Sequence, residues 1–267
     1  MKYYNELLSL GCFSLDDIKS FIPNKETAKN MLKEYIKKGA IERIKRNYYV
    51  AMDIVDNAPI FNKYVIATRL DDSNYIAYHS ALEYYGYHNQ VMNEVIFCGT
   101  RRFNDFYYDG NNYHYVASKC DLQIEEKEDS SRVTSLERTI IDCIDNLELA
   151  GGLEELYRAL DYVSNLNEKK FLDVLESYDK KSLYQRTGFI LSSFQEQLGL
   201  SDKFFKLILK KINNSVCYLD SKKGKTNFDS KWNVCYPSYL GQILNNGINI
   251  KNDIYNKDGV VSKSSLY

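Results

Sequence analysis

Paired cysteines and paired histidines are both missing from this sequence. Its six cysteines contain no CxxC pair, whereas zinc sites use closely spaced ligands and disulfide frameworks belong to short secreted chains. The three histidines have no partner four residues away and no cysteine at ligand spacing, so we expect them to be structural or exposed. These residues are Cys12, Cys98, Cys120, Cys143, Cys217, Cys235, His79, His88 and His114. We therefore expect no metal site and no cofactor.

Long hydrophobic runs are also missing. No stretch approaches the ~18 apolar residues of a membrane helix. The opening residues, MKYYNELLSL, lack the apolar run and small residues of a secretory signal. With 44% hydrophobic and 27% charged residues, the chain has the composition of an ordinary globular protein rather than a disordered one. We expect a cytoplasmic protein without membrane contact.

The positive charge is concentrated at the N-terminus. Residues 1–50 hold ten basic and six acidic side chains, which is a net charge of +4. Because the whole chain has a net charge of −1, the remainder sums to −5. A locally basic module on a mildly acidic body is typical of a protein that contacts nucleic acid at one end.

The stretch from Phe13 to Ala51 predicts a winged helix-turn-helix, a fold that places one helix in the major groove of DNA. An amphipathic helix over residues 2–10 precedes it. Ser14 is typical of a helix N-cap and Pro23 of a helix end, which predicts a second helix between them. Asn24 is the predicted N-cap of a third helix.

That third helix, expected from Lys25 to about Lys38, has one apolar side that should face the core. This side consists of Ala28, Met31, Leu32, Tyr35 and Ile36. A short hairpin follows, with Arg46-Asn47 at its tip, and forms the predicted wing.

The candidate DNA contacts lie on this helix and wing. In such modules the N-terminal half of the second motif helix meets base edges, and basic residues around it hold phosphates. Thr27, Asn30 and Lys33 are the candidates for base reading. The remaining candidates, suited to phosphates or to the wing, are Lys25, Lys29, Lys45, Arg46 and Asn47, and Arg46 also fits a minor groove. The alternative is that these lysines are only a solvated surface, but the order of the elements favours DNA contact.

The rest of the chain predicts a mixed body over residues 61–267. Dense β-formers and turns predict a small mixed sheet at about 72–133, and amphipathic spacing predicts a helical region at about 134–212. Strand-like pieces follow over 213–240. The expected fold class is therefore α+β: a winged helix-turn-helix at 1–60, then a mixed α/β body with a helical C-terminal region.

Two other functions stay open at this point. Asp109 or Asp121 with Glu125 and Lys127 spells the D…E-x-K pattern of metal-dependent nucleases, in which carboxylates hold Mg²⁺ and lysine steadies the attacking water. The pattern is short, and the acidic run around Glu125 is equally typical of a solvated turn, so we expect no enzyme. The second alternative is a winged-helix transcription factor whose large body senses a small ligand.

Four stretches, in order, carry a family resemblance. They are Arg46-Asn-Tyr-Tyr-Val-Ala51; Tyr78-His-Ser-Ala-Leu-Glu-Tyr-Tyr-Gly86; Ser135-Leu-Glu-Arg-Thr-Ile-Ile-Asp142 followed by Gly151-Gly152; and Arg186-Thr-Gly188 with the later Asp220 and Trp232-Asn-Val234. Together with the N-terminal module they span roughly residues 5–236, and the ordered set resembles the AbiEi family of bacterial antitoxins. Within these stretches we expect Arg138 and Arg186 to be structural, with Asp142 a ready partner.

The resemblance implies a function. Such proteins repress their own two-gene operon and belong to type IV toxin–antitoxin systems of abortive infection, a form of phage defence. The winged domain binds inverted repeats in promoter DNA, and the C-terminal region counteracts a nucleotidyltransferase toxin without a stable complex. The resemblance fits a monomer that binds DNA cooperatively and has no catalytic residues of its own. One departure is the net charge of −5 beyond residue 50, where this family often has a strongly basic C-terminal surface.

Overall fold

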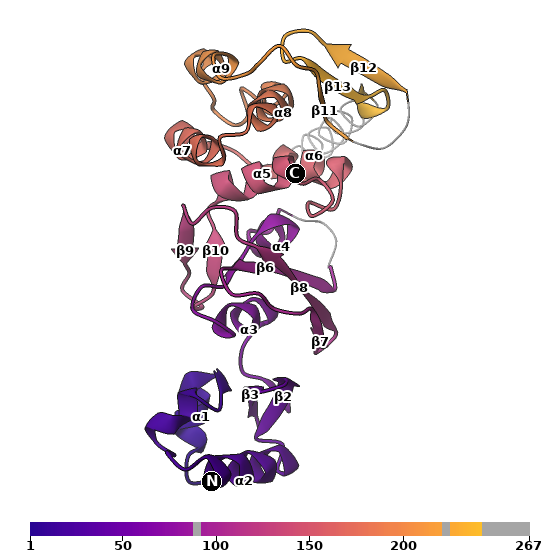
Figure 1. Cartoon of the computed structure of the whole chain (residues 1–267). Coiled ribbons are helices and arrows are strands. Elements are labelled where there is room, and N and C mark those ends of the chain that lie inside the picture. The colour runs from indigo at the N-terminus through magenta and orange to yellow at the C-terminus, as the bar shows by residue number, and fades with distance from the viewer. Residues whose placement is uncertain (88–91, 221–224, 242–267) are drawn as a thin grey trace, which may run out of the picture. The chain divides into compact units, whose positions relative to one another are not determined.

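The computed structural model describes residues 1–87, 92–220 and 225–241 (Figure 1). Helices and several sheets alternate along this part of the chain, which confirms the expected α+β class. Two compact units are formed. Unit 1 comprises Met1–Ala81 and the described residues from 92 to Ser135. Unit 2 comprises the residues from Leu82 to 87 and the described residues from Leu136 onward. Within the described ranges, no helix combines the length and the apolar character needed to cross a bilayer.

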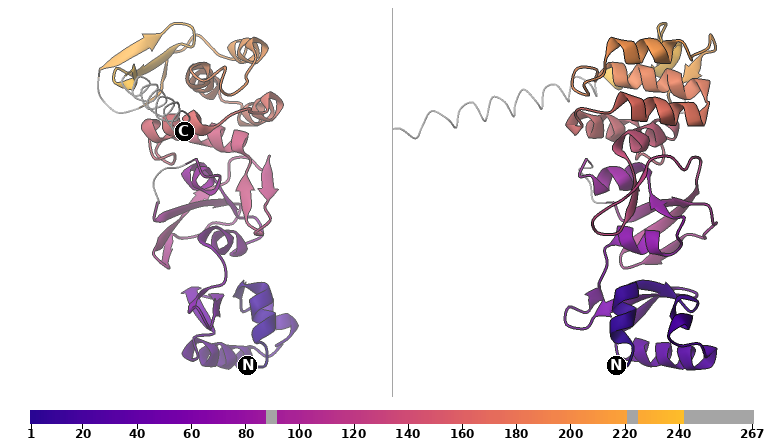
Figure 2. Two further views of the ribbon diagram at one scale, coloured as in Figure 1. Left: turned by 180° about the vertical axis from the view of Figure 1, so that it is seen from behind. Right: turned by 90° about the vertical axis from the view of Figure 1, so that its left-hand side faces the viewer.

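The first part of unit 1 is a small bundle of helices against a hairpin (Figure 2). In chain order its elements are α1 (Tyr4–Leu10), β1 (Cys12–Ser14), the 3₁₀ helix η1 (Asp17–Ser20), α2 (Lys25–Lys37), β2 (Ile41–Lys45), β3 (Tyr48–Asp53) and β4 (Ala58–Pro59). The strand β3 pairs antiparallel with β1, β2 and β4. Pro59 lies in the short strand β4.

The bounds of α2 agree with the sequence prediction because its ends are defined locally. The side chain of Asn24 accepts hydrogen bonds from the backbone N–H groups of Glu26 and Thr27, both at 3.0 Å, which satisfies donors that the helix cannot. Gly39 follows the helix with a φ of +67°, a conformation that glycine adopts without steric cost. The next turn contains Asn47 with a φ of +68°, which fits a tight hairpin.

The prediction of a helix between Ser14 and Pro23 is largely wrong. Ser14 is the last residue of β1, and only η1 is helical. The Ser14 N–H and Oγ donate to Asp17 Oδ2 at 2.6 and 2.8 Å, and the Asp16 N–H donates to Ser14 Oγ at 3.2 Å. The capping chemistry of Ser14 is therefore present, but Ser14 itself is paired with β3, and the residues after it form only the 3₁₀ helix η1 before Pro23.

The core of this part lies between α2, η1 and the hairpin. Ala28, Leu32 and Tyr35 are buried, at 2, 2 and 4% exposure, as the helical spacing predicted. Met31 is only partly buried, and Ile36 is 41% exposed. The prediction for Ile36 is wrong because it lies at the margin of the helix face that these three buried residues define.

The second part of unit 1 is a mixed sheet. Its elements are α3 (Lys63–Arg69), β5 (Tyr75–Ile76), the start of α4 (Tyr78–Tyr84), β6 (Glu94–Gly99), β7 (Phe106–Tyr108), β8 (Asn111–Ala117), β9 (Ile124–Glu126) and β10 (Arg132–Thr134). The end of α4, after Ala81, belongs to unit 2. Among the described residues the strand order is β7-β8-β6-β5-β10-β9, with β6–β8 and β5–β10 parallel. The predicted small mixed sheet is confirmed, and α3 packs on β5 and β6.

Residues 75–84 form a short strand followed by a helix. Tyr75 and Ile76 pair with Cys98 and Phe97 of β6. The helix α4 begins only at Tyr78, whose φ of +55° turns the chain away from the sheet. The apolar run of this segment therefore serves first a buried strand and then a helix.

Unit 2 is mainly helical. Its elements are α5 (Leu136–Asp145), α6 (Leu153–Tyr162), α7 (Glu168–Tyr178), α8 (Lys181–Ser192), α9 (Asp202–Leu209), β11 (Cys217–Tyr218), β12 (Thr226–Asp229) and β13 (Val234–Pro237). The helix α5 contacts α6, α7 and α8, and α8 also contacts α9 (Figure 1). The strands form a sheet of order β11-β13-β12 that packs on α8. The predicted helical region and strand-like end are thus confirmed in outline, while β12 was missed.

A buried ion pair lies at the centre of α5. Arg138 Nε donates to Asp142 Oδ1 at 2.7 Å, and both side chains are 2% exposed or less. The Tyr178 hydroxyl donates to the same carboxylate oxygen. Arg186 donates to the carbonyl oxygens of Tyr218 and Asp145, at 3.1 and 3.4 Å. The structural roles expected for both arginines are confirmed.

Gly188 makes a testable packing contact. A Cβ placed on it would lie 2.1 Å from Trp232 Cζ3, and Trp232 is 1% exposed. Although alanine is the better helix former by ~1 kcal/mol, we expect Gly188→Ala to destabilise unit 2 by about 1–3 kcal/mol through overpacking. Urea unfolding followed by the fluorescence of Trp232 measures this. The control is Gly241→Ala, where the added Cβ meets open space; equal stability of both variants would contradict the steric argument.

Candidate nucleic-acid interface

Three of the candidate residues on the outer surface of α2, and Lys37 beside them, make no side-chain hydrogen bond or ion pair to any described residue. The three candidates, Lys25, Asn30 and Lys33, are exposed. Asn30 and Lys33 lie one turn apart on the side opposite the buried Ala28 and Leu32. Their donors and acceptors are therefore available to a ligand.

Thr27 and Lys29 are engaged by neighbours on α2. Thr27 Oγ1 donates to Asn24 Oδ1 at 3.2 Å. Lys29 Nζ forms an ion pair with Glu26 Oε1 at 2.8 Å, and this hydrogen bond and charge lower the pKa of the Glu26 carboxyl. Because the two side chains are 42 and 73% exposed, the pair is weak, and a phosphate can compete with it.

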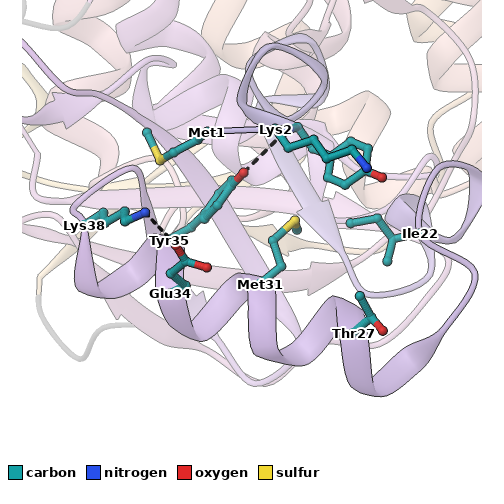
Figure 3. A pocket seen from close by; sticks show the side chains of 9 residues that line it. Met1, Lys2, Ile22, Thr27, Met31, Glu34, Tyr35 and Lys38 are labelled. Atoms are coloured by element: carbon teal, nitrogen blue, oxygen red, sulfur yellow. Dashed lines mark hydrogen bonds and ion pairs between the residues drawn. The ribbon is translucent and has the colours of Figure 1, made fainter.

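A shallow pocket of about 240 Å³ adjoins the Thr27 side of α2. Figure 3 shows Thr27, Met31 and Glu34 along that side of the helix, facing the start of the chain. Tyr35 closes the pocket floor, where its hydroxyl accepts a hydrogen bond from the Tyr3 N–H at 3.3 Å. Thr27 therefore lies on the flank of the exposed surface, whereas Asn30 lies at its centre.

The tip of the β2–β3 hairpin presents one arginine. Arg46 is exposed, and its guanidinium makes no hydrogen bond or ion pair to any described residue. Asn47 supplies the left-handed conformation of the turn, with a φ of +68°, so its role is evident in the backbone. The structure thus leaves Arg46 available at the end of a hairpin, as the sequence predicted.

Lys45 is placed differently from the other candidates. Its Nζ lies 4.8 Å from the ring centre of Phe103 and 4.7 Å from that of Phe106, and it donates to the carbonyl oxygen of Asn104 at 3.3 Å. Burial, followed by the charge of Arg101, lowers the pKa of Lys45. The structure therefore does not bring Lys45 together with the free cations; its phosphate contact stays a prediction that this placement does not favour.

The same contacts reveal a segment to which the sequence interpretation gave no role. Residues 100–105, between β6 and β7, lie against the hairpin of β2 and β3. They contain the adjacent pair Arg101-Arg102, both exposed. Two consecutive arginines directly after a β-forming run were the available sequence signal, but their place beside the β2–β3 hairpin depends on contacts between distant residues.

The nuclease pattern is not assembled as a complete set. Asp109 lies in the turn between β7 and β8, at one edge of the sheet, whereas Glu125 belongs to β9 at the other edge. Lys127 Nζ pairs with Glu125 Oε2 at 2.7 Å, and Asp121 accepts from Ser118 Oγ at 3.1 Å. In the described ranges no three His, Cys, Asp or Glu side chains are grouped as metal ligands.

The histidines that the structure describes are paired with acids. His79 is 1% exposed, and its Nε2 lies 3.1 Å from Glu94 Oε2. His114 is more exposed, and its Nδ1 lies 2.7 Å from Asp105 Oδ2. This confirms the expected structural or exposed character of these two, while His88 lies outside the described residues.

Comparisons with known proteins place the fold but no function. No protein-family model matches the chain, and no curated protein matches it. Among solved structures, the chain is similar to the crystal structure of the RV2827C protein from Mycobacterium tuberculosis, with a TM-score of 0.64 over 90% of each chain. Because the sequence identity is 11%, this likeness shows a shared fold alone.

Proposed function

We propose that this protein is a cytoplasmic, DNA-binding antitoxin that represses its own operon and has no catalytic activity. In this proposal the N-terminal residues 1–60 are a winged helix-turn-helix, with η1 as its reduced first motif helix, α2 as its recognition helix and the β2–β3 hairpin as its wing. The observation that carries the proposal is a set of exposed polar side chains on α2 and at the wing tip that make no side-chain hydrogen bond or ion pair to any described residue: Lys25, Asn30, Lys33 and Arg46. Lysine and arginine neutralise phosphates, and asparagine bonds bidentately to adenine.

The proposal of DNA binding is tested with the DNA upstream of the chain's own gene. We expect the purified protein to bind a fluorescent duplex of that DNA more tightly than an unrelated duplex of equal length. The logarithm of affinity should fall with the logarithm of salt concentration, by ~0.9 for each phosphate neutralised. Equal and salt-independent affinity for the two duplexes would remove this function.

The antitoxin half of the proposal rests on the resemblance of the four ordered motifs to the AbiEi family. The expected partner is a nucleotidyltransferase toxin encoded beside this chain, counteracted without a stable complex. Co-expression should restore growth to cells that produce the toxin, while the two proteins elute separately from a sizing column. A gene neighbourhood without a nucleotidyltransferase, or growth that co-expression does not restore, would argue against this half.

The second candidate function is a ligand-sensing winged-helix regulator. The pocket beside Thr27 favours it, because a small molecule bound there would touch α2 directly. Replacement of Met31 by tryptophan would fill this pocket. A metabolite extract that weakens promoter binding by the wild type, but not by Met31→Trp, would favour the sensor function over simple autorepression.

A further inference from the structure

The segment 100–105 is fixed beside the wing by aromatic packing. Phe103 is 7% exposed, and its ring lies 5.9 Å from Phe97 and 6.2 Å from Tyr115, within the second sheet. On its other side it lies 6.1 Å from Tyr48, the first residue of β3. The Lys45 ammonium packs on the same ring. Both residues that flank the Arg46-Asn47 turn therefore contact Phe103.

A second set of contacts joins the hairpin to the same sheet. The Tyr108 hydroxyl donates to Glu42 Oε2 at 2.8 Å and lies 3.9 Å from Met52 Sδ. Burial and the hydrogen bond to Glu42 raise the pKa of Tyr108, so this phenol stays a donor at physiological pH. With contacts on β2, β3 and the turn, the hairpin and segment 100–105 form one continuous part of unit 1.

The arginines of this segment differ in how they are held. Arg101 lies 5.6 Å from the Phe103 ring and 3.5 Å from Asp71 Oδ2, with its side chain 63% exposed. Arg102 is exposed, and its side chain makes no hydrogen bond or ion pair to any described residue. The nearby Asp105 is occupied by His114, at 2.7 Å, and by the Tyr115 N–H, at 2.9 Å. Arg102 is therefore a cation that this part of the chain leaves uncompensated.

We propose that the DNA-binding surface extends from the wing onto segment 100–105, where Arg102 binds a phosphate of the DNA backbone next to the groove that receives Arg46. This inference rests on the proposed DNA binding. It assigns the contact with DNA to unit 1 as a whole rather than to residues 1–60 alone. Arg101, backed by Phe103 and paired with Asp71, is a positioning residue for this segment.

The test compares the variants Arg102→Gln, Arg102→Lys and Arg46→Gln in the full chain, with Lys203→Gln as a control. Lys203 is an exposed lysine of α9 in unit 2. Affinity for the upstream duplex and for an unrelated duplex is measured by fluorescence anisotropy at salt concentrations from about 0.05 to about 1 M. Loss of one phosphate contact should lower the salt slope by ~0.9, which corresponds to about eight-fold weaker binding near 0.1 M salt.

The expected result is that Arg102→Gln weakens binding to both duplexes alike and lowers the slope, whereas Arg102→Lys retains both properties because it retains the charge. A melting temperature equal to that of the wild type shows that the fold is intact. If Arg46→Gln weakens binding and Arg102→Gln matches Lys203→Gln, the extension is refuted and the proposed function stands. If the wild type binds neither duplex, the proposed function itself fails.

Discussion

Replacement of Asp142 by asparagine is expected to destabilise unit 2 by about 3–5 kcal/mol, because it removes the negative charge that the buried Arg138 guanidinium contacts. Arg138 Nε and Asp142 Oδ1 are 2.7 Å apart, and both side chains are at most 2% exposed. Water therefore cannot take the place of the lost carboxylate. Asparagine keeps one oxygen that can accept the hydrogen bond of the Tyr178 hydroxyl. Urea unfolding followed by the fluorescence of the single tryptophan, Trp232, measures the free energy of unfolding of this unit.

The matched control is the double variant Arg138→Met with Asp142→Leu. Apolar residues of similar volume often replace a buried ion pair at little cost, whereas removal of one partner does not. We therefore expect the double variant to be more stable than Asp142→Asn. A double variant that is as unstable as the single one would show that packing around α5, rather than the uncompensated charge, accounts for the loss.

Local signals explain which elements could be predicted from the sequence. Asn24 as N-cap and Asn47 in the hairpin each act within a few residues, so α2 and the turn are predicted with correct positions. Ser14 shows the limit of this reasoning. Its hydrogen bonds to Asp17 are local, but its place in a strand depends on pairing with Tyr48 of β3, more than thirty residues away.

The candidate site divides in the same way. Helical periodicity placed Asn30 and Lys33 on the exposed surface of α2, and both are exposed. Periodicity could not show that Lys45 packs between Phe103 and Phe106, since these rings are almost sixty residues further along the chain. Nor could it place Arg102 beside the wing. Charges on a regular helix can be predicted from the sequence, whereas the partners of a hairpin tip depend on the tertiary fold.

Replacement of Asn30 by alanine is expected to relax the sequence preference of the protein without abolishing its binding to DNA. The side chain of Asn30 is exposed at the centre of the outer surface of α2. An asparagine that bonds bidentately to adenine contributes about 1–3 kcal/mol of discrimination against other bases. The measurement is the ratio of affinities for the upstream duplex and an unrelated duplex. That ratio should fall by roughly 5- to 150-fold, while affinity for the unrelated duplex stays unchanged.

Lys33→Ala and Lys37→Ala separate base reading from general electrostatics. Both lysines are exposed on the same side of α2, but Lys37 is the last residue of the helix, beyond the N-terminal half that meets base edges in winged modules. We expect Lys33→Ala to lower the affinity ratio and Lys37→Ala to leave it unchanged, because a contact to phosphate alone carries no sequence information. If Asn30→Ala and Lys33→Ala changed the ratio no more than Lys37→Ala, α2 would not be the recognition helix, and the DNA contact would belong to the wing.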